Sequence, residues 1–278
     1  MSIVRKFIQA KKNGQKLTLL TAYEALTAAM LEAEGVDCLL VGDSVGMVLL
    51  GYSSTLPVTM DEMIHHAKAV RRGAPKSFVI GDLPLKGIER GPRQALQSSK
   101  RFMKEAKCDA VKIEWHPDAL KSVALLVKNK IPVMAHIGLT PQNTGAGGKF
   151  KVQGQEARRA AELLKEALLL EKAGVFAVLL ECVPIPVARV ITGRLKIPTI
   201  GIGAGPYCDG QVLVFQDMIG LFKKFSPRFV KRFADADALM RKAVRQYAAE
   251  VKGRIFPSSK EGFLMNEKEA DLFGRMVE

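Results

Sequence analysis

Seven polar side chains follow short apolar segments of the chain, at points where a buried strand would end. They are Asp43, Ser44, Asp82, Lys112, Glu114, His136 and Glu181. A single residue of this kind is ordinary, because Asp and Ser often cap the helix that follows a strand. Its recurrence in segment after segment indicates instead that these side chains gather at one chemical site.

Three of these residues are carboxylates: Asp43, Asp82 and Glu114. Like charges that lie close together disfavour joint ionisation unless a cation compensates them. Oxygen ligands without cysteine or histidine partners suit a hard ion, Mg²⁺ first, which stays partly hydrated so that a substrate oxygen can enter its coordination shell. The sequence therefore predicts a Mg²⁺ site formed by the three carboxylates and completed by the substrate.

Lys112 and Glu114 lie two residues apart in the segment DAVKIE, so in a regular strand both side chains project to the same side. A lysine beside a metal site is best explained by an anionic substrate, such as a carboxylate, whose charge it balances. The alternative is a Lys–Glu ion pair that closes the interior of the protein.

Glu181 ends the apolar segment AVLLE. Partial desolvation there is expected to raise its pKa and make it a usable general base near neutral pH. Such a base could remove the proton next to the carbonyl of a ketone bound opposite it, because a metal ion stabilises the developing enolate. The predicted reaction class is metal-assisted enolisation of a small keto acid. His136 could hydrogen-bond the enolate or orient a neighbour, and both roles stay open.

Eight apolar segments rich in Val, Ile and Leu alternate with longer amphipathic ones, which is typical of strand–helix units around a parallel sheet. The expected strands cover residues 16–23, 36–43, 77–82, 109–114, 131–136, 175–181, 197–203 and 211–217. Eight such units in 278 residues favour a single-domain α/β protein, a closed (β/α)8 TIM barrel, over an open doubly wound sheet. In a barrel the C-terminal ends of all strands meet at one mouth, which would bring the seven polar residues together.

The expected organisation is a barrel with an N-terminal helix over residues 1–257, followed by a tail over residues 258–278 that packs on the barrel or on a neighbouring subunit. No apolar run approaches the roughly 20 residues of a membrane-spanning helix, and no signal peptide is evident. We therefore expect a cytoplasmic protein without a membrane partner.

The net charge of +14 is the one unusual global property. Its densest part covers residues 223–245, where Phe225, Phe229 and Phe233 recur at helical spacing among Lys and Arg. This spacing predicts a helix with a buried aromatic stripe and a solvated basic face. That interpretation is favoured over a nucleic-acid-binding surface, so no nucleic-acid partner is expected.

Several segments resemble, in collinear order, the ketopantoate hydroxymethyltransferase family, also called 3-methyl-2-oxobutanoate hydroxymethyltransferase. The matching segments include LLVGDSVGM (39–47), GDLP (81–84), VKIE (111–114), PVMAHIGLTPQ (132–142), LLECVP (179–184) and IPTIGIGAG (197–205). The resemblance implies a Mg²⁺-dependent (β/α)8 barrel enzyme of pantothenate biosynthesis. Such an enzyme transfers a hydroxymethyl group from 5,10-methylenetetrahydrofolate to 3-methyl-2-oxobutanoate and gives 2-dehydropantoate.

On the matching positions, the resemblance implies that Asp43 and Asp82 bind the metal, with Glu114 as a further ligand or an outer partner. It implies keto acid contacts from Asp43, Ser44, Asp82 and Lys112, with His136 nearby. Glu181 would be the proton acceptor. The family resemblance also implies a cytoplasmic homo-oligomer, commonly a decamer.

The segment FPSSKEGF (256–263) departs from the FP-x-x-EHSF pattern of many family members, which puts any folate contact from the C-terminus in doubt. The nearest rival is a phosphoenolpyruvate mutase or isocitrate lyase relative, since these enzymes share metal-dependent enolate chemistry. The chain has no KKCGH-like cysteine motif to support a lyase. A remote rival is a non-catalytic barrel that binds nucleic acid through its basic surface.

Overall fold

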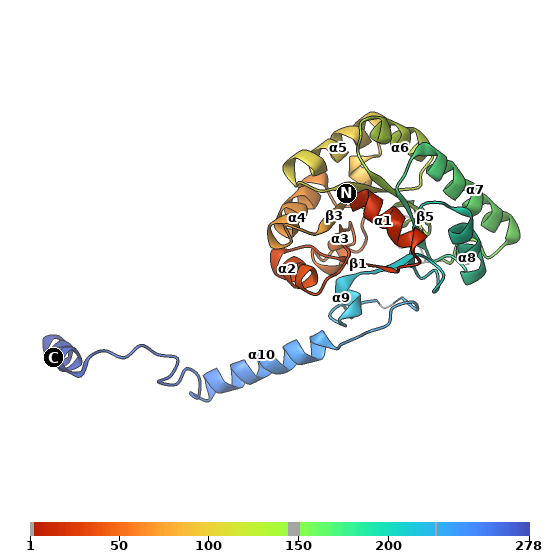
Figure 1. Ribbon diagram of the computed structural model, residues 1–278. Coiled ribbons are helices and arrows are strands. Elements are labelled where there is room, and N and C mark those ends of the chain that lie inside the picture. Colours follow the sequence, from red (N-terminus) through yellow and green to blue (C-terminus); the bar gives the residue numbers. More distant parts are fainter. Residues whose placement is uncertain (1–2, 144–150, 226) are drawn as a thin grey trace.

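A computed structural model describes residues 3–143, 151–225 and 227–278 of the chain. Eight parallel strands form a closed barrel in sequence order, and the last strand pairs with the first (Figure 1). The strands are β1 (Leu17–Thr21), β2 (Cys38–Val41), β3 (Phe78–Asp82), β4 (Ala110–Glu114), β5 (Val133–Gly138), β6 (Ala177–Glu181), β7 (Thr199–Ile202) and β8 (Gly210–Leu213). The predicted (β/α)8 fold is confirmed.

Most of the helices surround this barrel, and those between strands connect them, whereas the last two helices of the chain lie outside it. Those up to β5 are α1 (Ile3–Lys12), α2 (Ala25–Ala33), α3 (Val45–Val48), α4 (Met60–Gly73), η1 (Leu85–Gly87), α5 (Pro92–Glu105) and α6 (Ala119–Lys128). Those after β5 are η2 (Pro141–Asn143), α7 (Ala157–Ala173), α8 (Ile185–Arg194), α9 (Phe215–Met218), α10 (Ala236–Lys252) and α11 (Glu267–Val277).

The strands are mostly apolar because both of their faces are covered, and their ionisable residues lie toward their C-terminal ends. Every residue of β2, β3, β4 and β5 is buried, as expected for a parallel sheet between an outer layer of helices and a filled interior. Phe7 of α1 packs at one end of the interior, with ring centroids 5.2 Å from Phe78 and 5.7 Å from Phe176. This aromatic cluster fills one end of the barrel and leaves the polar mouth at the other.

The register of the strands places the polar residues at matching heights. Asp82 is the partner of Lys112, and Glu114 is the partner of His136. Glu181 pairs with Gly138, which lies two residues beyond His136 on β5. The strand ends therefore form a ring of ionisable groups at one mouth, as the sequence predicted.

The helix expected over residues 223–245 does not begin until Ala236, so this prediction is wrong for the first part of the segment. Pro227 lacks the N–H that a helix interior needs. Gly220 has a φ of +69°, and there the backbone passes too close to Ala234 O for a side chain. Phe233 is 64% exposed, and the predicted buried stripe of phenylalanines does not form.

The last barrel strand, β8, ends at Leu213, and the short helix α9 that follows it ends at Met218. The boundary expected at residue 257 stays a prediction. Helix α10 projects away from the barrel, and residues 258–278 with α11 lie farther out (Figure 1). Neither helix has a buried residue. None of the described helices is long and apolar enough to cross a membrane.

Candidate active site

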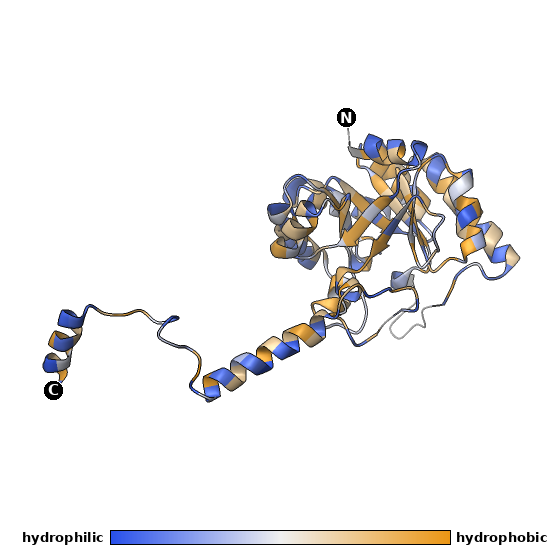
Figure 2. Cartoon of the chain, turned by 60° about the horizontal axis from the view of Figure 1, so that its bottom comes forward, coloured by the Kyte–Doolittle hydropathy of each residue, from blue (hydrophilic) through white to orange (hydrophobic). Residues whose placement is uncertain are grey.

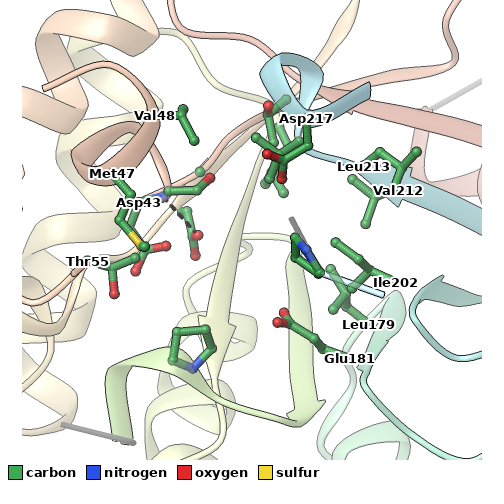
Figure 3. A pocket seen from close by; sticks show the side chains of 18 of the residues that line it. Asp43, Met47, Val48, Thr55, Leu179, Glu181, Ile202, Val212, Leu213 and Asp217 are labelled. Carbon is green, nitrogen blue, oxygen red and sulfur yellow. Dashed lines mark hydrogen bonds between the residues drawn. The ribbon is translucent and has the colours of Figure 1, made fainter. Parts of the chain in front are cut away.

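A cleft opens at the C-terminal ends of the strands. It is lined by all seven of the residues predicted from the sequence: Asp43, Ser44, Asp82, Lys112, Glu114, His136 and Glu181. Figure 3 shows part of this cleft, with Asp43, which follows β2, and Glu181, which ends β6, among the residues that line it. The fold thus brings together residues that are up to 138 positions apart, from 43 to 181.

Lys112 is the cation at the centre of the site. Its Nζ donates hydrogen bonds to both carboxylate oxygens of Asp82, at 2.8 and 2.7 Å, and lies 3.9 Å from Glu114 Oε1. Burial opposes the charge of Lys112, but the surrounding carboxylates outweigh it and raise the lysine pKa. The predicted alternative of a Lys–Glu pair is therefore a minor part of the arrangement, since Asp82 is the closer partner.

Asp43 and Asp82 adjoin each other with too little positive charge to balance them. The Asp43 backbone N–H donates to Asp82 Oδ2 at 3.2 Å. Burial raises the pKa of Asp82 to about 6 in spite of Lys112, and burial also raises the pKa of Asp43. Two buried neighbouring carboxylates that favour protonation fit a site for a hard cation.

Glu114 is near the same lysine but farther from it than Asp82, with its Oε1 3.9 Å from Lys112 Nζ. Among the described residues, no group of three or more carboxylate, histidine or cysteine side chains is close enough to form a compact metal cluster. Mg²⁺ is commonly held by one or two carboxylates, with water and substrate oxygens filling the remaining positions. Asp43 and Asp82 fit that arrangement, with Glu114 as an outer partner.

His136 lies between two carboxylates. Its Nδ1 is 3.3 Å from Glu114 Oε1 and its Nε2 is 3.3 Å from Glu181 Oε2, close enough for ion pairing although the atoms are not aligned as hydrogen bonds. Burial and the Lys112 ammonium lower the pKa of His136, but the two carboxylates outweigh them and raise it to about 9. A protonated His136 would hold Glu181 in place at the cleft wall.

Ser44 precedes the short helix α3, yet its side chain makes no capping hydrogen bond. Its Oγ instead forms a hydrogen bond of 2.8 Å with the Tyr23 hydroxyl. The simple capping alternative therefore does not account for Ser44, whose hydroxyl is fixed at the edge of the cleft.

Sequence reasoning missed several residues of the site. Gln142 donates from Nε2 to Asp43 Oδ2 at 2.8 Å and from its backbone N–H to Glu114 Oε2 at 3.1 Å. It lies in the segment PVMAHIGLTPQ, four residues after β5, where its amide could have been noticed. Asp217 also lines the cleft and is the last residue of the segment 211–217 that was expected to be a strand. That prediction is wrong for the second half of the segment, because β8 ends at Leu213 and Asp217 belongs to α9.

Comparisons with known proteins point to one family. The model of the family described as "Ketopantoate hydroxymethyltransferase" matches residues 2–259. A 3-methyl-2-oxobutanoate hydroxymethyltransferase from Clostridium novyi is 47% identical over 268 residues, which cover 96% of this chain and 98% of that protein. One from Oleidesulfovibrio alaskensis is 52% identical over 262 residues, which cover 94% of this chain and 91% of that protein.

Solved structures with a similar fold are more distant in sequence. Phosphonopyruvate hydrolase in complex with oxalate and Mg²⁺ superposes with a TM-score of 0.61 at 13% identity, covering 100% of this chain and 98% of that chain. Phosphoenolpyruvate phosphomutase from Streptomyces platensis subsp. rosaceus gives a TM-score of 0.61 at 15% identity, covering 99% and 96%. These likenesses establish a shared barrel fold only.

Proposed function

The chain belongs to the ketopantoate hydroxymethyltransferase family and is a hydroxymethyltransferase, and from this premise we propose the reaction in detail. The proposed substrates are 3-methyl-2-oxobutanoate, 5,10-methylenetetrahydrofolate and water, and the products are 2-dehydropantoate and tetrahydrofolate, on the route to pantothenate. The methylene carbon leaves both folate nitrogens, bonds to C3 of the keto acid and takes its hydroxyl from water. The observation that carries this proposal is the convergence of carboxylates and one ammonium in a single cleft.

Asp43 and Asp82 are the proposed ligands of Mg²⁺, with Glu114 as an outer partner. The raised pKa values of both aspartates support this assignment, because each carboxyl group is short of positive charge. When bound, the ion would polarise the keto oxygen and stabilise negative charge that develops on it. Gln142 donates a hydrogen bond to Asp43 Oδ2 and so fixes the orientation of this carboxylate.

Lys112 and Ser44 are the proposed partners of the keto acid. The Lys112 ammonium is buried at the base of the cleft and can balance the substrate carboxylate, while the Ser44 hydroxyl offers a hydrogen bond at its edge. The hydrogen bond between the Tyr23 and Ser44 hydroxyls restricts the Ser44 side chain, so less conformational entropy is lost when substrate binds. These two residues would orient C3 of the substrate toward β6.

Glu181 is the proposed general base, and it takes the proton from C3 of the keto acid. Its carboxylate reaches the cleft from the end of β6, and its side chain is 14% exposed, so a substrate can approach it. His136 acts as a positioning residue, because its imidazolium lies between Glu181 and Glu114 and restrains both carboxylates. The pair thus keeps the base oriented without changing its charge.

Product analysis tests the proposed reaction. Purified protein incubated with Mg²⁺, 3-methyl-2-oxobutanoate and 5,10-methylenetetrahydrofolate should form 2-dehydropantoate, identified by mass spectrometry. Omission of the folate should abolish product. Absence of 2-dehydropantoate in the complete mixture would contradict the proposal, and conversion of phosphonopyruvate to phosphoenolpyruvate would favour the mutase alternative.

We also propose that the chain works in the cytoplasm as a homo-oligomer, for which the family resemblance implies a decamer. In this assembly the C-terminal segment packs on a neighbouring subunit. Helix α10 carries an apolar stripe at helical spacing, formed by Met240, Val244, Tyr247 and Val251, and the four side chains are 53%, 65%, 59% and 42% exposed. Figure 2 shows such apolar residues interspersed along the projecting helix. An exposed apolar stripe of four neighbouring side chains indicates a surface that binds another protein.

Replacing both Val244 and Tyr247 with Asp should reduce the oligomer to smaller species, because two charges would have to be buried in the subunit interface. Light scattering after size-exclusion chromatography measures the mass directly. The matched control is Lys242→Asp, which lies on the opposite face of α10 and should leave the mass unchanged. A monomeric wild-type protein, or an unchanged mass for the double variant, would contradict the assembly proposal.

A further inference from the structure

The cleft extends beyond the residues assigned to the keto acid and the metal. Its outer part is apolar and aromatic and is lined by Val214, Phe222, Phe225, Pro227 and Phe229. Ligand sites are typically lined by hydrophobic and aromatic side chains together with a few polar groups, and this part of the cleft has that character. It therefore offers a surface for a second ligand beside the first.

The aromatic wall is built into the fold. Gly203, which follows β7, has a φ of +65°, and an added Cβ there would lie 2.7 Å from the Phe229 ring. Only a glycine permits this close approach together with this backbone conformation. Phe229 is thus held over the end of β7, at the rim of the strand ends that carry the polar site.

Asp217 is the one acidic residue in the lining of this cleft that has not yet been assigned to the metal, the keto acid or the base. Figure 3 shows it among the cleft-lining residues. It lies on α9 and is partly buried. Among the residues that the structure describes, no hydrogen bond or ion pair engages its carboxylate, although Arg232 is near enough to lower its pKa somewhat. Burial dominates and raises the pKa of Asp217 to about 6.

A carboxylate that is partly desolvated without a partner is costly for the folded protein. Burial of this kind is explained when a ligand supplies the missing hydrogen-bond donors. The ligand must present paired donors to the carboxylate and a flat apolar face to the phenylalanines. The 2-amino-4-oxo ring edge of a pterin meets both requirements, since N3–H and the 2-amino group lie side by side in the plane of an aromatic ring.

We propose that Asp217 recognises the pterin of the folate co-substrate, with N3–H and the 2-amino group donating to its two oxygens and the Phe222 and Phe229 rings enclosing the heterocycle. This inference rests on the proposed function and deepens it. Because Asp217 and Glu181 line the same cleft, a folate bound at Asp217 shares one cavity with the keto acid.

A neighbouring cavity is the competing location. It is lined by His116, Asp118 and Gln142 and holds two buried atoms without hydrogen-bond partners, His116 Nε2 and Gln142 Oε1. Glu114 and Gln142 form part of the wall of this cavity, and Glu114 also lines the main cleft. Its lining offers no aromatic wall beyond the His116 ring. The main cleft is therefore favoured, and the neighbouring cavity becomes one outcome of the test.

The test compares Asp217→Asn with the matched control Asp118→Asn by calorimetric titration with tetrahydrofolate and by steady-state kinetics. Loss of a paired, charge-assisted contact should weaken tetrahydrofolate binding by about ten- to hundred-fold and raise the KM for 5,10-methylenetetrahydrofolate similarly. The folate-independent exchange of the C3 proton serves as the reference, so the ratio of transfer to exchange should fall. The Asp118 variant should bind tetrahydrofolate as the wild type does.

A thermal melt separates this role from a structural one. Asp217→Asn removes an unpaired, partly buried charge, so its melting temperature should equal or exceed that of the wild type. Unchanged tetrahydrofolate affinity in Asp217→Asn would overturn the inference, and so would weakened affinity in Asp118→Asn instead. A wild-type protein that neither binds tetrahydrofolate nor forms 2-dehydropantoate would overturn the proposed function and this inference with it.

Discussion

Replacement of Glu181 by Gln is expected to lower both C3 proton exchange and hydroxymethyl transfer by roughly two to four orders of magnitude, the usual contribution of a general base. An amide has nearly the shape of the carboxylate but cannot accept the proton from C3. It can still contact His136 Nε2, which lies 3.3 Å from Glu181 Oε2. The variant should therefore fold normally and retain binding of the metal and the keto acid.

Exchange kinetics by NMR, together with titration of the keto acid, measure the two effects separately. The matched control is Glu89→Gln, an exposed glutamate that lines the neighbouring cavity. That variant should exchange and transfer at wild-type rates. If Glu181→Gln kept most of its turnover, the base would have to be another residue. If it lost keto acid binding instead, Glu181 would be a binding residue.

Replacement of Asp82 by Asn should have an effect of similar size on activity, for a different reason. The change removes one proposed ligand of Mg²⁺ and the closest partner of the Lys112 ammonium. Metal-dependent exchange should fall by a factor of about a hundred or more, because a bound metal contributes several kcal/mol of charge stabilisation. Loss of half of a buried ion pair should also lower the stability of the fold, by about 3–5 kcal/mol.

Mg²⁺ titration monitored by the melting temperature distinguishes these two effects. Wild-type protein should melt at a higher temperature as Mg²⁺ is added, since a ligand that binds only the native state stabilises it. The Asp82→Asn protein should start lower and show no such increase. The matched control, Asp118→Asn, should respond to Mg²⁺ as the wild type does. An undiminished increase in the Asp82 variant would show that the ion binds elsewhere.

Much of the fold could be predicted because the barrel imposes a simple pattern on the sequence. Each parallel strand is buried on both faces, so it reads as a short apolar run, and the eight runs correspond to the eight strands. The polar residues that end these runs lie at one mouth for the same reason. Local patterning and overall topology agree there, and the seven predicted site residues therefore line one cleft.

The segment after β8 could not be predicted in this way. Phe225 and Phe229 have helical spacing, but Pro227 and the turn at Gly220 prevent a helix, and both rings line the cleft instead. The periodicity of apolar residues indicates that their side chains are covered. It does not indicate whether the hydrophobic core or a bound ligand covers them. The projecting helix α10 shows the same limit, since its apolar stripe stays exposed, although the Tyr247 ring contacts Phe256 just beyond the helix.

The contacts between side chains within the site could not be predicted from the sequence either. The two-residue spacing of Lys112 and Glu114 pointed to a Lys–Glu pair as the structural alternative, whereas the strand register sets Lys112 beside Asp82. Gln142, which contacts Asp43 and Glu114, comes from the three-residue helix η2, which is too short for any periodic pattern to specify. Contacts between neighbouring strands depend on register, which a single sequence does not display.

The central claim is that this cleft enolises a keto acid with Mg²⁺ before any one-carbon transfer takes place. Incubation of the wild-type protein with 3-methyl-2-oxobutanoate in deuterated water, without folate, tests it most directly. The account predicts that the C3 proton exchanges for deuterium when Mg²⁺ is present and that chelation of the metal by EDTA stops the exchange. Retention of the C3 proton in the presence of Mg²⁺, or exchange that continues unchanged after chelation, would contradict it.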